Sequence, residues 1–267
     1  MSRRGRGVPL VAVLLALVAV AFFVLPLVGL VQRAPWGEVW DDLSNPAARD
    51  AIRLSLECSL WSTGLSILFG VPLAYVLARS RFPGRSLVRA LVVLPMVLPP
   101  VVGGIALLFA FQRNNGLIGG WLYDTFGLQF TFSKTGVILA ETFVAMPFLV
   151  ITVEAGLRSM DRRYEDAAAS LGANRWTVFR RVTLPLVGPA LFAGAALAWA
   201  RALGEFGATI TFAGNIRGRT QTIPLAVYNL LETDQGTAIA LSLVLLAVSV
   251  IVLVLLRDHW FGGLRDP

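Results

Sequence analysis

The chain has 267 residues, of which 56% are hydrophobic and only 15% charged, and its mean hydropathy is +0.72. Soluble domains carry about 25% charged residues, so the composition indicates an integral membrane protein. Its apolar segments run along the whole length, and we therefore expect one domain over residues 1–267. The net charge of +7 does not indicate a nucleic-acid partner, because the arginines lie beside apolar segments and no basic patch alternates with aromatic residues.

Few side chains are available for metal binding or nucleophilic catalysis. The single cysteine, Cys58, allows no internal disulfide, and the single histidine, His259, lies near the C-terminus. These counts exclude a His/Cys metal cluster and a catalytic triad built on histidine. We therefore expect no catalytic residue, no metal and no cofactor in this chain.

Six segments are apolar enough to cross a bilayer, which takes about 20 residues in a helix. The first follows three arginines and imitates a signal peptide, but its apolar run continues past the cleavage-like box at residues 19–21, which favours a retained span. The third contains Pro95, Pro99 and Pro100, which must bend or break a helix. The expected spans are residues 8–31, 60–78, 90–111, 136–157, 186–202 and 236–256.

The distribution of arginine and lysine predicts the orientation of the chain. If the N-terminus is cytosolic, the cytosolic segments hold fifteen of these residues and the external loops hold seven, with Arg201 inside the fifth span. The positive-inside rule then places both termini and residues 158–185 in the cytosol. The connections that begin at residue 114 and at residue 214 are external.

The longest polar interruption, residues 158–185, has helical character of its own. Glu165 and Asp166 fall in the first turns of an expected helix, where negative charge suits the helix dipole. Gly172 stands where a glycine ends a helix, and Asn174 is placed to cap a second short helix. Five residues fall on one face of a 3.6-residue period: Met160, Tyr164, Ala167, Ala168 and Leu171. From periodicity alone, an ordinary connection and a docking surface for another protein remain alternatives.

The same segment resembles the EAA loop of ABC-importer permeases, which reads Glu-Ala-Ala, three residues, Gly, nine residues and Ile-x-Leu-Pro. Asp166 replaces the glutamate and Val182 replaces the isoleucine, and both keep charge or shape. The resemblance implies a cytosolic coupling loop that contacts an ATP-binding subunit. Its expected coupling residues are Tyr164, Glu165, Asp166, Ala167, Ala168, Gly172, Leu184 and Pro185.

The chain lacks the phosphate-binding loop of an ATPase, which needs G-x-x-x-x-G-K-[ST]. The only lysine, Lys134, is followed by Thr135, but Ser133 stands where the glycine is required. If ATP drives transport, another subunit therefore binds the nucleotide, and residues 158–185 form the cytosolic surface that can receive it. The missing phosphate-binding loop indicates such a subunit independently of the family resemblance.

A second informative stretch begins at Arg201. Arg201 and Glu205 are four residues apart, on one helix face near the outer end of the fifth span, where ionisable residues are costly. They are a salt bridge that fixes the helix end, a gating pair, or a contact to the substrate. Gly204, Gly207 and Ala208 beside them permit close approach of another helix.

Three runs in this stretch are similar to the molybdate permeases. They are GEFGA at residues 204–208, AGN at 213–215, and RTQT at 219–222 with Pro224 and Leu225 after it. The related sulfate and thiosulfate permeases share the Gly-Glu-aromatic-Gly run and the Gly-Asn pair, but differ after Gly207 and after Gly214. With the EAA loop, the similarity covers most of the chain from Tyr75 onward.

This resemblance implies an all-α integral membrane permease of MetI-like architecture, with about six transmembrane helices, in the cytoplasmic membrane of a prokaryote. The implied partners are an ABC ATP-binding subunit, an external substrate-binding protein, a second copy of the permease and the lipid bilayer. The implied function is ATP-driven import of molybdate, and tungstate, sulfate or thiosulfate remain alternative cargoes.

Two other classes of protein remain as alternatives. A secondary transporter needs no ATPase and often shows inverted repeats or ionisable residues at the membrane midplane. No repeat is evident here, and Glu141, Arg201 and Glu205 lie toward one end of their spans. A membrane-embedded enzyme needs a cluster of polar catalytic groups, and no His, Asp or Cys constellation lies within the expected spans.

Overall fold

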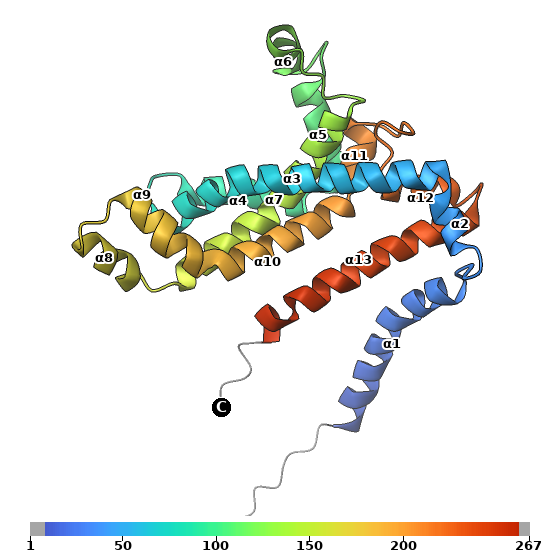
Figure 1. Cartoon of the computed structure of the whole chain (residues 1–267), viewed down its shortest axis with the longest axis horizontal. Helices are drawn as coiled ribbons and strands as arrows, with labels where there is room; N and C mark the ends of the chain where they lie inside the picture. Colours follow the sequence, from blue (N-terminus) through green and yellow to red (C-terminus); the bar gives the residue numbers. More distant parts are fainter. Residues whose placement is uncertain (1–8, 262–267) are drawn as a thin grey trace, which may run out of the picture.

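The structure is a computed structural model that describes residues 9–261, with side chains up to Leu256. Within that range the chain consists of helices and their connections, without a strand (Figure 1). The elements are α1 (Leu10–Gln32), α2 (Val39–Ser44), α3 (Pro46–Arg79), α4 (Arg85–Val97), α5 (Pro100–Phe111), α6 (Gly119–Phe126), α7 (Lys134–Ser159), α8 (Arg163–Ser170), α9 (Arg175–Val178), the π-helical turn η1 (Phe179–Thr183), α10 (Leu184–Leu203), α11 (Gly207–Phe212), α12 (Ile223–Leu230) and α13 (Gln235–Phe261).

Five helical runs among the described residues are long and apolar enough to cross a membrane. They are α1, α3, α7, the continuous run 175–203 and the part of α13 up to residue 256. The expected third span is not one helix, because α4 and α5 meet at an angle of 119°. Pro99 and Pro100 lie at this break, where a missing backbone N–H and the proline ring cannot continue a helix. The predicted all-helical membrane fold and the predicted break are confirmed.

Two helix starts differ from the expected spans. Helix α3 begins at Pro46 instead of Leu60, because the side chain of Asn45 accepts a hydrogen bond from the Ala47 N–H (3.1 Å) and proline fits the first helical turn. The first turns of α3 are polar, so hydropathy alone misses them. The fifth span also begins earlier than Leu186. Its cause is different: α9, η1 and α10 form one continuous helical run without a loop.

The core lies where α3, α7 and α10 pack side by side (Figure 1). Its buried residues are mostly alanine, valine and leucine, and small residues bring the helices together. At Gly194 in α10, an added Cβ would lie 3.3 Å from the backbone of Leu149 in α7. Close backbone contact of this kind stabilises helix pairs in a membrane. Apolar side chains gain little there by moving from lipid to a helix interface, because lipid tails are equally apolar.

Helices α5 and α11 pack against each other even more closely. A side chain at Gly104 would overlap the Thr211 hydroxyl, and one at Gly207 would lie 2.8 Å from the Cβ of Pro100. The backbone of Ala208 also faces Gly104. The close approach predicted at residues 207 and 208 is therefore present, whereas an added Cβ at Gly204 would meet only the Ala200 carbonyl oxygen, at 3.6 Å.

Helix α1 lies apart from the rest of the bundle. Figure 1 shows it, in blue, diverging from α13, and none of its side chains is buried. Its 23 residues are nevertheless strongly apolar. A helix that is apolar all round requires an apolar environment on every side, which lipid or another membrane protein supplies.

Candidate functional site

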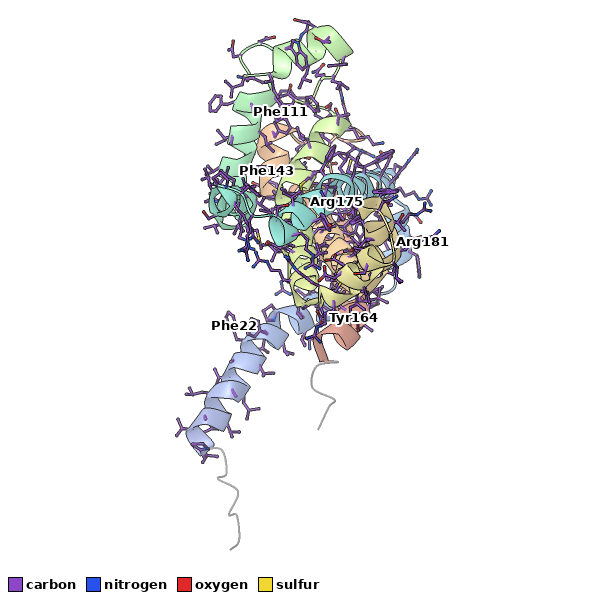
Figure 2. All side chains as sticks on the ribbon, turned by 90° about the vertical axis from the view of Figure 1, so that its left-hand side faces the viewer. Phe22, Phe111, Phe143, Tyr164, Arg175 and Arg181 are labelled. Carbon is purple, nitrogen blue, oxygen red and sulfur yellow. The ribbon has the colours of Figure 1, made fainter. Side chains whose placement is uncertain are left out.

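Charged and aromatic side chains gather at one end of the bundle, where α3 and α7 end and α4 and α10 begin. This end lies at the left of Figure 1 and carries α8 and α9 at its tip. Figure 2 looks directly at it and labels Tyr164, Arg175 and Arg181 there. We call residues 163–183 the coupling segment, because they correspond to most of the loop that the sequence singles out.

The coupling segment consists of two helices joined at Gly172, as the sequence predicts. Helix α8 ends in a hydrogen-bonded C-terminal motif, in which the Ala173 N–H donates to the Ala168 carbonyl (3.1 Å) and the Gly172 N–H to the Ala169 carbonyl (3.0 Å). Gly172 has φ +85°, a conformation that glycine adopts without cost. Asn174 caps α9 by accepting a hydrogen bond from the Thr177 N–H (2.8 Å).

Apolar side chains of the coupling segment face outward. Leu171 is 89% exposed, and Tyr164 and Trp176 are exposed as well. The prediction that Met160 shares this face is wrong. Met160 follows the last turn of α7 with extended backbone and lies before α8 begins. Leu171 and Tyr164 stand on a polar segment beyond the apolar spans, so a protein surface is a better cover for these two side chains than lipid.

Glu165 and Asp166, adjacent in sequence, have different surroundings. Glu165 is turned toward the bundle: its carboxylate accepts a hydrogen bond from the Thr183 hydroxyl (2.7 Å), and its Oε2 lies 3.2 Å from Nη2 of Arg79 at the end of α3. Asp166 is exposed. Glu165 therefore ties the coupling segment to α3, whereas Asp166 is available to a partner.

The remaining motif residues lie on α8 and at the start of α10. Ala167 is exposed on α8, and Ala168 is half-buried. Leu184 and Pro185 begin α10 directly after the π-helical turn η1, inside the continuous helical run 175–203. Phe179 links the segment to α3, because its ring packs edge-on against Tyr75 with 5.3 Å between the centroids.

A cluster of charges at the same end was not predicted. The carboxylate of Glu154 in α7, largely buried, forms ion pairs with three arginines: with Arg158 at 2.8 Å, with Arg85 at 3.9 Å, and with Arg89. The spacing of Glu154 and Arg158 along one helix is visible in the sequence. The pairing with α4 is not, because Arg89 is 65 residues away.

Arg201 and Glu205 meet as one of the sequence alternatives describes. Nη1 of Arg201, in the last turn of α10, lies 2.6 Å from Oε2 of Glu205. Glu205 is 1% exposed, and its other oxygen accepts a hydrogen bond from the Ala208 N–H (2.8 Å) at the start of α11. One carboxylate thus joins the end of α10 to the beginning of α11, which in turn packs on α5.

Further ionisable side chains lie toward the opposite end. Lys134 at the start of α7 pairs with Glu57 of α3 beside an open cavity of about 320 Å³, which Arg53 and Arg219 also line. Glu141 in α7 is 1% exposed, and its Oε2 has no hydrogen-bond partner among the described residues. A buried carboxyl oxygen without a hydrogen-bond partner is costly, and nothing in the sequence predicted this one.

The described residues form a membrane bundle with a broken span and a projecting two-helix segment. The fold is similar to that of a solved bacterial alginate ABC transporter in complex with its alginate pentasaccharide-bound periplasmic protein. The TM-score is 0.68 and the identity 21%, over 94% of each chain. At this identity the likeness shows the fold alone.

Sequence comparison gives the family. The profile described as "Binding-protein-dependent transport system inner membrane component" matches residues 66–259, and the chain belongs to this family. It is 47% identical to the molybdenum transport system permease protein ModB of Mycobacterium tuberculosis, over 90% of each chain. It is 40% identical to the sulfate transport system permease protein CysT of Escherichia coli strain K12, over 86% of this chain and 83% of that protein.

Proposed function

We propose that this chain is the membrane-spanning permease subunit of an ATP-driven importer of molybdate. The observation that carries the proposal is the 47% identity, over 90% of each chain, to a molybdenum transport permease. The sulfate permease, at 40%, is the second candidate, and the run of residues 219–222 favours molybdate over it. The cargo is a tetrahedral oxyanion in both cases.

The proposed complex contains two copies of the permease, two ATP-binding subunits on the cytosolic side and an external binding protein. The exposure of α1 on all sides supports the second copy, whose spans would cover it. The chain has no phosphate-binding loop, so ATP hydrolysis belongs to a partner and the permease is the translocation subunit. A periplasmic protein is part of the alginate transporter that shares this fold.

In this proposal, the coupling segment transmits the closure of the ATP-binding subunits to the spans. The residues that meet the ATP-binding subunit are Tyr164, Asp166 and Ala167 on α8 and Leu171 directly after it. Glu165 acts as a positioning residue, since its contacts to Arg79 and Thr183 connect α8 with α3 and with the start of α10. A displacement of α8 therefore moves two spans together, and the bundle alternates between inward and outward openings.

The assignment is tested with the purified permease, its ATP-binding subunit and its binding protein in lipid vesicles. Binding protein loaded with molybdate is expected to stimulate ATP hydrolysis and to deliver molybdate into the vesicles. The same protein offered sulfate is the control. Stimulation by sulfate alone would transfer the assignment to the sulfate permeases, and uptake without any ATP-binding subunit would identify a secondary transporter.

The proposed orientation makes a separate prediction for single cysteines introduced at Ser170 and Asn115, both of which are exposed. The native Cys58 is buried and can be replaced by serine to give a cysteine-free background. A cysteine at residue 170 should react with a membrane-impermeant maleimide only after the membrane is opened, and one at residue 115 should react in intact spheroplasts. The reverse pattern would invert the orientation.

A further inference from the structure

A cavity of about 710 Å³ lies between the last turns of α3 and the second helix of the coupling segment. One end of it carries two arginines, Arg79 and Arg175, together with Ser80. The rest is apolar and aromatic, and it extends two turns along α3 into the apolar part of the span. The lining residues at this apolar end are Pro72, Tyr75, Val76, Trp176 and Phe179.

Arg79 is not satisfied by the contacts that this chain gives it. Its side chain is 10% exposed, and its Nη2 lies 3.2 Å from the Glu165 carboxylate. Neither that nitrogen nor Nε has a hydrogen-bond partner among the described residues. Buried donors are nearly always paired, so the cavity that Arg79 lines is expected to hold an acceptor. Arg175, which is exposed at the same end, adds a second positive charge.

We propose that this cavity binds one anionic phospholipid of the cytosolic leaflet. Its phosphate would lie between the guanidinium groups of Arg79 and Arg175, and an acyl chain would lie along α3 past Val76. The inference rests on the proposed orientation, which places this end of the bundle at the cytosolic surface.

Three features favour a lipid over a soluble anion or a protein side chain. The two guanidinium groups outnumber the one nearby carboxylate, so the polar end attracts an anion. The aromatic rings of Tyr75 and Trp176 line the same cavity, and such rings are enriched where proteins meet lipid headgroups. The apolar end lies beside Pro72 and Val76, within a membrane span, where an acyl chain can reach and a cytosolic protein cannot. Basic pockets between helices on the cytosolic side bind anionic lipid headgroups in this way.

The bound lipid would have a mechanical consequence for the coupling segment. It would contact α3 through Arg79 and Val76 and the second coupling helix through Arg175 and Trp176. It would therefore add to the link that Glu165 already makes between the same two parts. An anionic lipid would stabilise the docked position of the coupling segment against α3.

The experiment measures lipid binding to the full permease alone, purified in detergent, by native mass spectrometry. Phosphatidylglycerol is the probe, phosphatidylcholine the neutral control, and glycerol 3-phosphate the control for a free phosphate. We expect retention of phosphatidylglycerol over both. Arg175→Gln should weaken its binding about fivefold, as expected for one arginine at an anionic surface. Val76→Trp should also weaken it, because the indole fills the apolar end.

Two matched variants keep the test specific. Arg181→Gln removes the same charge from an exposed position that does not line the cavity, and Val97→Trp adds the same bulk to an exposed position on α4. Neither should change phosphatidylglycerol binding. Equal binding of the neutral lipid, equal binding of glycerol 3-phosphate, or no effect of Arg175→Gln would overturn the proposal. A separate co-purification of the assembled complex gives one more test: loss of the ATP-binding subunit from Arg175→Gln, with lipid binding to the permease alone intact, would also overturn the proposal, because the cavity would then belong to that subunit.

This readout is independent of transport. A permease that carries sulfate instead of molybdate would bind the lipid unchanged, so failure of the cargo assignment does not affect it. An inverted orientation is detected separately by the cysteine at residue 170. Failure of lipid binding in a permease that imports molybdate normally would reject only the lipid site.

Discussion

Leu171→Asp is expected to abolish most ATP-driven uptake while the permease remains inserted and folded. Leu171 is 89% exposed at the tip of α8, so the substitution removes no packing within the chain. If the coupling segment docks on the ATP-binding subunit, the substitution loses about 2 kcal/mol of apolar burial and adds a charge to a buried interface. The association should weaken at least about 30-fold. Co-purification of the ATP-binding subunit and uptake by whole cells measure the two effects.

The matched control for this experiment is Leu117→Asp. Leu117 is 88% exposed in the connection between α5 and α6, away from the coupling segment. It should leave the association with the ATP-binding subunit unchanged. If both variants lose the subunit equally, the effect is general instability. If neither does, α8 is not the docking surface.

Substitutions at Gly172 distinguish two requirements of the coupling segment, its backbone conformation and its contact with the partner. A Cβ added at this position would meet nothing within 4 Å in this chain, so the positive φ is the main strain that a side chain would introduce at the backbone. Asparagine tolerates that conformation much better than leucine. Gly172→Asn should therefore retain more coupling than Gly172→Leu. Equal loss in both would indicate that the partner approaches too closely for any side chain.

The parts of the fold that follow from local chemistry could be predicted from the sequence. Caps and breakers act on their immediate neighbours, which is why Asn174, Gly172 and the prolines at 99 and 100 marked real helix ends. Asn45 caps the start of α3, but hydropathy marks only the apolar part of that helix, because its first turns are polar.

Contacts between distant segments could not be predicted in the same way. Glu165 and Asp166 carry the same charge and are adjacent in the sequence. Only the contacts of Glu165 with Arg79 of α3 and Thr183 of η1 distinguish them. The ion pairs of Glu154 with α4 depend on the angle between α4 and α5, which the prolines permit but do not set. A family motif identifies such residues without saying which of them face a partner.

The contacts at the two ends of the bundle are connected through helices. At the coupling end, Glu165 and Phe179 fasten α8 and η1 to α3. At the other end, Glu205 fastens α10 to α11, and α11 packs tightly on α5. Because α10 runs from one end to the other, we propose that a movement of the coupling segment would reach Arg201 and Glu205 along this helix. This places the ion pair where it can transmit movement to the broken span.

Arg201→Gln is expected to be the most damaging single change at that ion pair. It leaves the Glu205 carboxylate, which is 1% exposed, without its partner, and an uncompensated buried charge costs about 3–5 kcal/mol. Glu205→Gln should cost less, because the amide oxygen can still accept the Ala208 N–H and because Arg201 keeps some access to water. The double variant should recover part of the loss. Yield of the folded complex, measured for the wild type and the three variants, tests this order.

The same four proteins distinguish an organising pair from a substrate contact. If Arg201 binds the oxyanion, Arg201→Gln will give an intact complex whose ATPase activity no longer responds to loaded binding protein, and Glu205→Gln will not rescue it. If the pair holds α10 to α11, yield and stimulation will fall together and recover together in the double variant. We expect the second outcome, because both oxygens of Glu205 are already engaged by Arg201 and by the first turn of α11.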